Sequence, residues 1–380
     1  MNDTLGHVVG DSILIQVANR IKKEIRDTDV LSRFGGDEFT LLLPNVKNTT
    51  VIDRIAQNII DAVKKPFEIQ ERTLYISASI GITLYPDDGR DKLSLLRNAD
   101  QAMYQAKHSG RSQFHYFTSY MQELAQKRHV MLSDMHKAIK EGQFEVYYQP
   151  IVDTRSGKVV KAEALARWKH PKNGVISPAE FIPLAEESGL ILEVGSWIYK
   201  TAVSQVAKWR EEYDPEFKVS INKSPIQFKV SQTLDEWMSH IDESGIDGTS
   251  IILEITEGIL MEEDELVKQK LMTFREKGIE VAIDDFGTGY SALSYLKKFD
   301  IDYLKIDKSF VDNVATSQQD KVLSEAMIAM AHKLDIQVIA EGVEDAEQKE
   351  ILTNMGCDFI QGYIYSKPLP AKEFERVFLA

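Results

Sequence analysis

Polar and charged residues follow a series of short apolar runs in the second part of the chain, and together they could do chemistry. They are Gln149, Glu163, Asn222, Glu254, Asp284, Asp285, Lys305, Glu341 and Gln361. Five carboxylates and the amide of Asn222, with one lysine and no histidine in the set, offer hard oxygen ligands that suit Mg²⁺ or Mn²⁺ better than zinc. Packed together without metal, so many carboxylates would repel one another, and some would bind protons.

The adjacent pair Asp284 and Asp285 has particular chemical potential. Neighbours in a regular strand point to opposite faces, but a turn at the strand end can direct both carboxylates into one site. One of them could then bridge two metal ions about 4 Å apart, as two-metal phosphoesterase sites require. The segment FGTGYSAL that follows predicts a loop with backbone freedom, and Glu257 is placed to anchor that loop.

Plainer interpretations of these acids stay open. A strand-end acid can simply cap the helix that follows it, and Glu257 can be an acid favoured by the dipole at a helix start. Capping explains one or two such residues. A polar or charged residue of this set in every one of the eight runs favours a shared site.

Eight β-branched runs from Phe144 onward predict the elements that position these residues. They are FEVYYQPIV, VVKAEALARW, FKVSIN, SIILEIT, IEVAIDD, DYLKID, IQVIAEG and DFIQGY. Runs separated by helical patterns are typical of a (β/α)₈ TIM-like barrel, an α/β fold whose active sites lie at the C-terminal mouth. We assign residues 130–380 to this domain.

Residues 1–117 show a different order of helix, hairpin, helix, strand and helix, which predicts a smaller α+β domain. Within it, the segment SRFGGDEFTLLLP predicts a hairpin whose turn presents two carboxylates. A helical pattern from Tyr116 to Glu141 predicts a linker helix over residues 118–141. Its interpretation as the ordinary first helix of the second domain is equally good.

Composition bounds the classes of partner. A net charge of −14 argues against binding duplex nucleic acid, but not against a small anionic ligand held with metal ions. The single cysteine, Cys357, excludes an internal disulfide and predicts a reducing, cytoplasmic location for this chain. No apolar run approaches the roughly 18 residues that cross a bilayer, so no membrane segment is expected.

The motif EALARW, Glu163 to Trp168, stands among seven further blocks: YYQP, SPAEFIPLAEESGLI, SIN, LEITE, IDDFGTGYSALSYLKKFDIDYLKID, VIAEGVE and QGYIYSKP. In this order they closely resemble the EAL family of cyclic-di-GMP phosphodiesterases, over essentially all of residues 130–380. The resemblance implies metal-dependent hydrolysis of one phosphodiester bond of cyclic-di-GMP, giving linear pGpG.

The resemblance also implies roles for single residues. A first Mg²⁺ or Mn²⁺ ion would be held by Glu163, Asn222, Glu254 and Asp284, and a second ion with its water by Asp284, Asp285 and Glu341. Lys305 would orient or activate the water, with Glu341 as the proton acceptor and Asp285 beside them. The dinucleotide would contact Gln149, Leu165, Arg167 and Gln361.

Two further features follow from the same resemblance. Lys223 stands where the family usually has an apolar residue, and we expect it to alter the charge of the mouth slightly. The family often dimerises through its barrel, with the DFGTGYS loop coupling the interface to the site. A homodimer is therefore expected.

The first domain is similar to the GGDEF family of diguanylate cyclases through NDTLGHVVGD, RFGGDEF, SASIGIT and ADQAMYQAKHSGRSQF. The resemblance implies that Gly35 and Gly36 admit a triphosphate, that Asp37 and Glu38 serve metal and catalysis, and that Asn2 and Asp11 read guanine. Arg26 and Asp29 stand where the family carries an inhibitory product site, although such a charge pattern is common on surfaces.

In that family, a strand ending in a metal-binding aspartate precedes the dipeptide Asn2-Asp3. Only Met1 stands before Asn2 in this sequence, so we expect a nucleotidyl-cyclase-like domain that lacks its first strand. Without the metal-binding aspartate of that strand, we expect no cyclase activity, which leaves the domain a regulatory role. Two alternatives to a phosphodiesterase remain. A non-hydrolysing cyclic-di-GMP receptor is disfavoured by the intact acid set, and a synthase or bifunctional enzyme by the expected loss of the strand.

Overall fold

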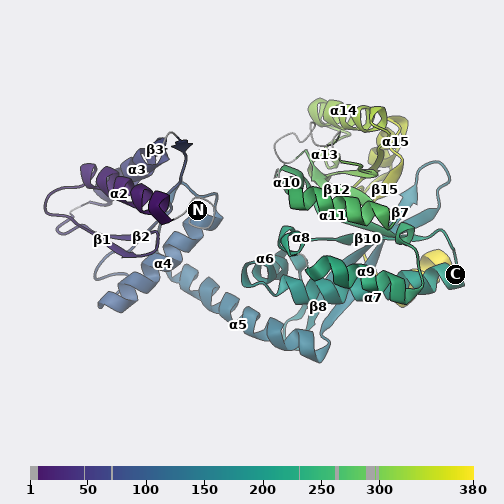
Figure 1. The fold of residues 1–380 in the computed structure, drawn as a ribbon, viewed down its shortest axis with the longest axis horizontal. Coiled ribbons are helices and arrows are strands. Elements are labelled where there is room, and N and C mark those ends of the chain that lie inside the picture. Colours follow the sequence, from purple (N-terminus) through teal and green to yellow (C-terminus); the bar gives the residue numbers. More distant parts are fainter. Residues whose placement is uncertain are drawn as a thin grey trace. The chain divides into compact units, whose positions relative to one another are not determined.

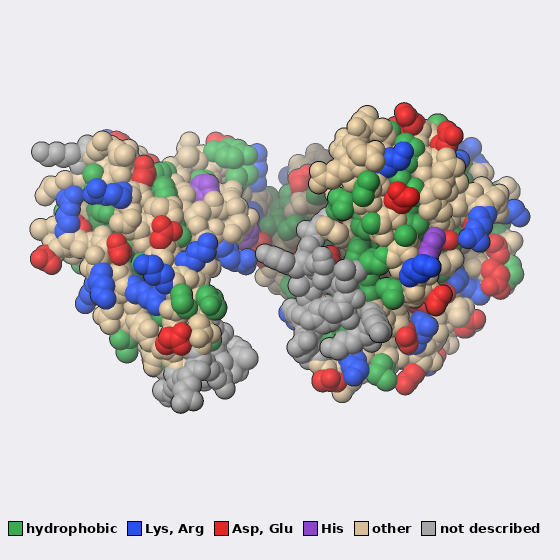
Figure 2. Space-filling model, turned by 90° about the horizontal axis from the view of Figure 1, so that it is seen from above, with side chains coloured by type: hydrophobic (Ala, Val, Ile, Leu, Met, Phe, Trp, Pro, Cys, Tyr) green, Lys and Arg blue, Asp and Glu red, His purple; other side chains and the backbone are tan. Residues whose placement is uncertain are grey.

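The computed structural model of the chain describes residues 7–46, 48–69, 72–230, 232–261, 265–287, 296 and 299–380. By its internal contacts the chain divides into two units, Met1–Val130 and Met131–Ala380. Among the residues described, no helix is both long and apolar enough to cross a membrane. Acidic and basic side chains are interspersed over the face shown in Figure 2.

Two helices and a hairpin form the core of the first unit. Helix α2 (His7–Lys23) and helix α3 (Thr49–Lys64) bury residues four apart, such as Ile13, Val17 and Ile21 on α2, in one apolar cluster. Between them, β1 (Val30–Gly35) and β2 (Glu38–Leu42) pair in antiparallel fashion. The predicted helix–hairpin–helix order is confirmed.

The rest of the first unit contains more short strands than the pattern predicts. Strands β3 (Phe67–Ile69) and β4 (Arg72–Leu74) form a second hairpin, and β5 (Ile80–Ile82) pairs in parallel with β6 (Phe114–Tyr116). Helix α4 (Lys92–His108) connects β5 to β6. Gly81 lies against the α4 backbone so closely that a Cβ atom would stand 1.9 Å from the Ala99 carbonyl oxygen.

Helix α5 (Ser119–Glu141) contains the boundary between the two units. The second unit begins within it and continues into a closed barrel of eight strands (Figure 1). The strands are β7 (Phe144–Asp153), β8 (Val159–His170), β10 (Lys218–Asn222), β11 (Ile251–Thr256), β12 (Glu280–Phe286), β13 (Tyr303–Ile306), β14 (Gln337–Ala340) and β15 (Phe359–Gln361).

The barrel closes through β7, which is antiparallel to both of its neighbours, β8 and β15. The expectation that a helix separates the first two runs is wrong: β7 and β8 form a hairpin. The cause is local. The Asp153 carboxylate accepts the N–H groups of Arg155 and Ser156 at 3.1 and 2.6 Å, and Gly157 adopts φ +69°, which closes a tight turn.

Helices pack outside the barrel and bury its outer surface, as Figure 1 shows for α7, α9, α11 and α14. After α5, the α-helices in the described residues of this unit are α6 (Pro178–Ser188), α7 (Ile191–Glu212), α8 (Pro225–Lys229), α9 (Gln232–Ser244), α10 (Glu257–Met261), α11 (Glu265–Glu276), α13 (Lys308–Val311), α14 (Gln318–Lys333), α15 (Ala346–Asn354) and α16 (Ala371–Phe374). Short strands β9 (Gly174–Ile176) and β16 (Leu369–Pro370) extend the sheet at β8 and β7.

Candidate active site

Lys305 on β13 is the centre of the acid cluster that the sequence predicts. Its side chain is 1% exposed, and its Nζ lies 2.5 Å from Glu341 Oε1, 2.8 Å from Glu254 Oε2 and 3.1 Å from Asp284 Oδ1. Glu163 Oε2 on β8 lies 3.7 Å from the same nitrogen. Strands β8, β11 and β12, together with the residue that follows β14, thus bring four carboxylates around one ammonium group.

The electrostatics of this cluster follow from burial and excess negative charge. Burial acts against the charged form of Lys305, yet the surrounding carboxylates, Asp284 first, raise its pKa well above the usual value. Burial and then the neighbouring Glu163 raise the pKa of Glu254 well above its usual range. One lysine therefore leaves the cluster with more acid groups than it can neutralise.

Glu163 is held by amide side chains. It accepts hydrogen bonds from Asn222 Nδ2 at 2.6 Å and from Gln361 Nε2 at 2.5 Å. Burial opposes its charged form, but Lys305 and these hydrogen bonds outweigh that effect and lower its pKa. Gln361 Nε2 also lies 3.2 Å from Gln149 Oε1, and Gln149 Nε2 donates to the Ser366 carbonyl at 3.3 Å.

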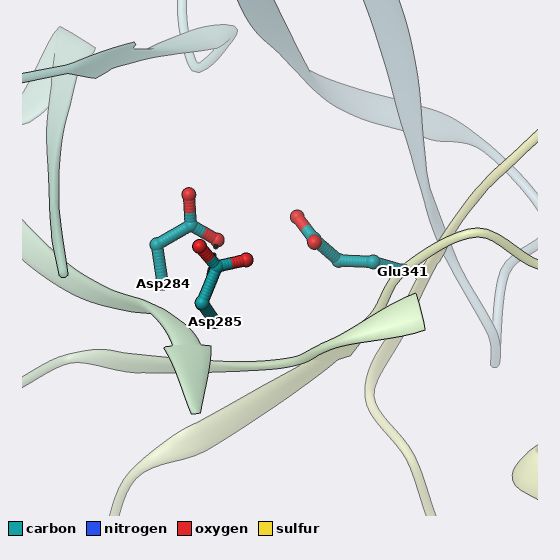
Figure 3. Close-up of side chains that lie close together, drawn as sticks. All are labelled: Asp284, Asp285 and Glu341. Atoms are coloured by element: carbon teal, nitrogen blue, oxygen red, sulfur yellow. Dashed lines mark hydrogen bonds between the residues drawn. The ribbon is translucent and has the colours of Figure 1, made fainter. Parts of the chain in front are cut away.

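The end of β12 directs two neighbouring carboxylates into the same space. Asp285 has φ +54°, and the register with β13 shifts between Ile283 and Phe286, which marks a bulge. Carboxylate oxygens of Asp284, Asp285 and Glu341 consequently lie within 4.8 Å of one another. Figure 3 shows the three side chains facing one another from β12 and from the segment after β14.

Asp285 and Glu341 both have raised pKa values. Burial, followed by the nearby Asp284, raises the pKa of Asp285. Burial raises the pKa of Glu341 to about 8; Lys305 opposes this rise, whereas Asp284 and Glu163 add to it. Asp307, which follows β13, also contributes to the shift of Asp285. The sequence pattern did not single out Asp307, although it ends the run DYLKID.

Leu165 and Arg167 on β8 lie further along the strand than Glu163 and are half-buried. The Arg167 guanidinium donates to the Ala166 carbonyl at 2.7 Å and lies over the Tyr147 ring at 5.6 Å. Glu257 begins α10 and is buried. The loop that it is expected to anchor, FGTGYSAL at residues 286–293, is described at Phe286 and Gly287, and residues 288–293 lie outside the described residues.

Lys223 has no part in the charge of this cluster. Its ammonium is buried over the rings of Trp237 on α9 and Phe274 on α11, at 3.6 and 5.4 Å. Burial lowers the pKa of Lys223 to about 7. The expectation that it alters the charge of the mouth is therefore not supported by its position, because the side chain packs in the helical layer.

In the first unit, the predicted GGDEF residues occupy an exposed hairpin turn. Gly35, Gly36, Asp37 and Glu38 are all exposed, and the Arg33 side chain donates to the Gly36 carbonyl at 2.7 and 2.9 Å. Gly36 has φ +49°, which glycine adopts readily. Arg33, which the prediction did not include, therefore supports the turn.

The other predicted residues of this unit that the structure describes, Asp11, Arg26 and Asp29, are not part of an acid cluster. Asp11 is exposed on α2, and Asn2 lies outside the described residues. Asp29 accepts the backbone N–H of Arg26 at 2.8 Å, so this pair forms a local turn. Within the described part of the unit, no three carboxylate or imidazole groups come together as metal ligands could.

Comparison with known proteins identifies the class to which this fold and acid cluster belong. Residues 132–368 match the family model of the EAL domain, and residues 1–113 match that of the diguanylate cyclase, GGDEF domain. The chain belongs to the EAL domain family and carries a GGDEF domain at its N-terminal end. Both predicted resemblances are confirmed.

Two curated relatives match almost the whole chain. It is 37% identical over 373 residues to "Bifunctional diguanylate cyclase/cyclic di-GMP phosphodiesterase MucR" of Pseudomonas aeruginosa, covering 98% of this chain and 54% of that protein. It is 39% identical over 376 residues to "Cyclic di-GMP phosphodiesterase PdeR" of Escherichia coli, covering 99% and 56%. The chain thus spans about half the length of these relatives.

A solved structure resembles the second unit. The structure described as "PaMucR Phosphodiesterase, c-di-GMP complex" superposes with a TM-score of 0.62 at 34% identity. It covers 64% of this chain and 99% of that one.

Proposed function

We propose that the second unit hydrolyses one phosphodiester bond of cyclic-di-GMP and releases linear pGpG. The observation that carries this proposal is the ring of carboxylates around the buried Lys305 in a barrel of the EAL family. The relatives named as cyclic di-GMP phosphodiesterases support the choice of substrate.

We propose that two Mg²⁺ or Mn²⁺ ions complete the site. The residues fit such ions: Glu254 Oε1 is buried without a hydrogen-bond partner in the described part of the chain, and the oxygens of Asp284, Asp285 and Glu341 converge. Glu163, Asn222, Glu254 and Asp284 would hold one ion, and Asp284, Asp285 and Glu341 the other. When bound, the ions would neutralise phosphate charge and lower the pKa of bound water.

The chain's own residues would bind the dinucleotide and manage the proton. Lys305 is close enough to Glu341 and Asp284 to orient a water molecule between them. Bound cations would favour the ionised form of Glu341, which would then accept the proton of that water. Arg167 would meet a phosphate or base edge, and Leu165 a base or sugar. Gln149 and Gln361 would also contact the dinucleotide, with Gln361 hydrogen-bonded to both Glu163 and Gln149.

We propose that the first unit makes no cyclic-di-GMP and regulates the activity of the barrel. Asp37 and Glu38 are exposed on their hairpin, and the described residues around them offer no third ligand. Formation of cyclic-di-GMP from GTP by the purified chain would contradict this proposal. The family resemblance also leads us to expect a homodimer through the barrel, which light scattering would test.

The main test is incubation of the purified chain with cyclic-di-GMP and Mg²⁺ or Mn²⁺, followed by chromatography of the products. We expect pGpG from the wild type and none after chelation. Glu163→Gln and Asp284→Asn should abolish turnover, whereas Glu344→Gln, an exposed acid that pairs with Lys308, should leave it unchanged. Tight binding without pGpG would instead identify a receptor, and full activity in Asp284→Asn would refute the metal assignment.

A further inference from the structure

Strand β8 has two faces with different neighbours. Because side chains alternate along a strand, Glu163, Leu165 and Arg167 share one face, and Ala166 and Trp168 belong to the other. The first face carries a carboxylate of the Lys305 cluster and the two residues assigned to the dinucleotide. The second face is buried, with Trp168 0% exposed. Contacts that hold Trp168 in place therefore also hold the backbone of β8 from which the Arg167 side chain projects.

The C-terminal half of α5 packs on the buried face. Met135 and Ala138 of α5 are fully buried in an apolar cluster that contains Ala166 and Trp168, separate from the main core of the barrel. The chain then leaves α5 through Gln143, whose Oε1 accepts from Trp168 Nε1 at 3.1 Å. The Gln143 carbonyl also accepts the N–H of Lys169 at 2.8 Å. Side-chain and backbone contacts thus tie the end of α5 to the outer part of β8.

A polar contact completes this attachment. His170 is buried at the end of β8, and its Nδ1 accepts the backbone N–H groups of Lys172 and Asn173 at 3.2 and 3.1 Å. Since Nδ1 is an acceptor, Nε2 carries the hydrogen and donates it to Asp134 Oδ2 of α5 at 3.3 Å. This hydrogen bond lowers the pKa of Asp134, which keeps its carboxylate ionised and able to accept.

We propose that the C-terminal half of α5 positions the Leu165–Arg167 edge of β8 for the dinucleotide, with Asp134, Trp168 and His170 as positioning residues. The inference rests on the proposed hydrolysis of cyclic-di-GMP. None of the three residues contacts the Lys305 cluster in the structure, so their effect would pass through Arg167 and leave the metal-binding acids intact. An interaction present in both the bound substrate and the transition state changes KM more than kcat.

The test uses the full chain with steady-state kinetics on cyclic-di-GMP. For Asp134→Ala and His170→Ala we expect KM to rise about 3- to 30-fold, from the coupling typical of contacting residues, with kcat within about twofold. Glu123→Ala and His136→Ala are matched controls, because both residues are exposed on α5, and they should leave KM unchanged. The Mn²⁺ concentration for half-maximal activity should stay the same in all four variants.

A double-variant cycle separates positioning from a merely structural role. In an Arg167→Ala background, Asp134→Ala should raise KM by less than about twofold, since the side chain that it positions is gone. Full multiplication of the two effects would overturn the proposal, as would a fall in kcat and melting temperature at constant KM. If the wild type makes no pGpG, hydrolysis fails as the function. In that case the dissociation constants of the same single and double variants for cyclic-di-GMP replace their KM values and test the positioning role.

Discussion

At the scale of single residues, Lys305 shows why this barrel mouth suits a cation. One ammonium contacts Glu254, Asp284 and Glu341 directly, and Glu163 stands at 3.7 Å. Burial, with the excess of neighbouring carboxylates added to it, raises the pKa values of Glu254 and Glu341. Divalent cations would relieve this repulsion and favour the ionised carboxylates. The arrangement of the cluster therefore favours the binding of cations more than the stability of the cation-free fold.

The first prediction concerns the charge of Lys305. Replacing it in Lys305→Met should lower kcat for cyclic-di-GMP about 10²- to 10⁴-fold, the range for a lost proton-handling group. The measurement is pGpG formation at saturating Mn²⁺. Lys308→Met is the matched control, because Lys308 is half-exposed and forms ion pairs with Asp312 and Glu344. Equal losses in both variants would argue for a general effect on the fold.

The residues of this site were predictable to different degrees. Glu254, Asp284, Lys305 and Glu341 end apolar runs, and parallel strand ends meet at one mouth, so their convergence follows from the pattern. The partners of Gln149 were not predictable. They depend on β7 being antiparallel, which places Gln149 opposite Glu163 and within hydrogen-bond distance of Gln361.

At the scale of elements, the bulge at the end of β12 creates the three-carboxylate group. Asp285 adopts a left-handed φ, and this conformation lets consecutive aspartates face one site instead of opposite faces. Asp and Asn tolerate this region better than other residues with a Cβ atom. The residue type at position 285 therefore serves both the backbone and the chemistry.

The second prediction separates these two roles. Asp285→Asn should keep the melting temperature within about 2 °C while removing most turnover, because asparagine fits the backbone but lacks the negative charge. Asp285→Ala should lose turnover and also about 1 kcal/mol of stability, the cost of the left-handed conformation. Thermal unfolding and pGpG assays on the same preparations measure both. Equal stability of the two variants would show that the conformation is not under strain.

The hairpin of β7 and β8 shows where the sequence pattern misleads. Residues 154–158 connect the two strands, and five residues cannot hold the crossover of a dozen or more that parallel strands need. The short TRSGK connection was the available signal. The other strands do alternate with helices, which is why the barrel itself was predictable from the eight runs.

At the scale of the whole molecule, the second unit has a dense core that only global unfolding should open. Cys357, the only cysteine of the chain, is 1% exposed, with its Sγ 3.6 Å from the Val338 carbonyl oxygen of β14, and burial raises its thiol pKa to about 12. The third prediction is that a thiol reagent such as dithionitrobenzoate does not react with the folded chain at pH 8. One equivalent should react in guanidinium chloride. Rapid reaction of the native protein would show local opening of this region.

The last prediction concerns where the second unit begins. Contacts place its start at Met131, and the buried Met135 and Ala138 of α5 complete the apolar cluster around Trp168. A fragment of residues 119–380 should therefore fold and hydrolyse cyclic-di-GMP. A fragment of residues 142–380 loses α5 and exposes that cluster. We expect its melting temperature to fall by about 4–8 °C, from the loss of one large and one small core residue.

A fragment of residues 126–380 is the matched control, since it removes only the first turns of α5 and keeps both buried residues. Its melting temperature and its KM for cyclic-di-GMP should equal those of the fragment of residues 119–380. If residues 142–380 melted at the same temperature and bound cyclic-di-GMP equally well, α5 would belong to the connection between the units. A loss confined to 142–380 would instead make the helix part of the barrel domain, because its side chains complete a core that the strands and α6 leave open.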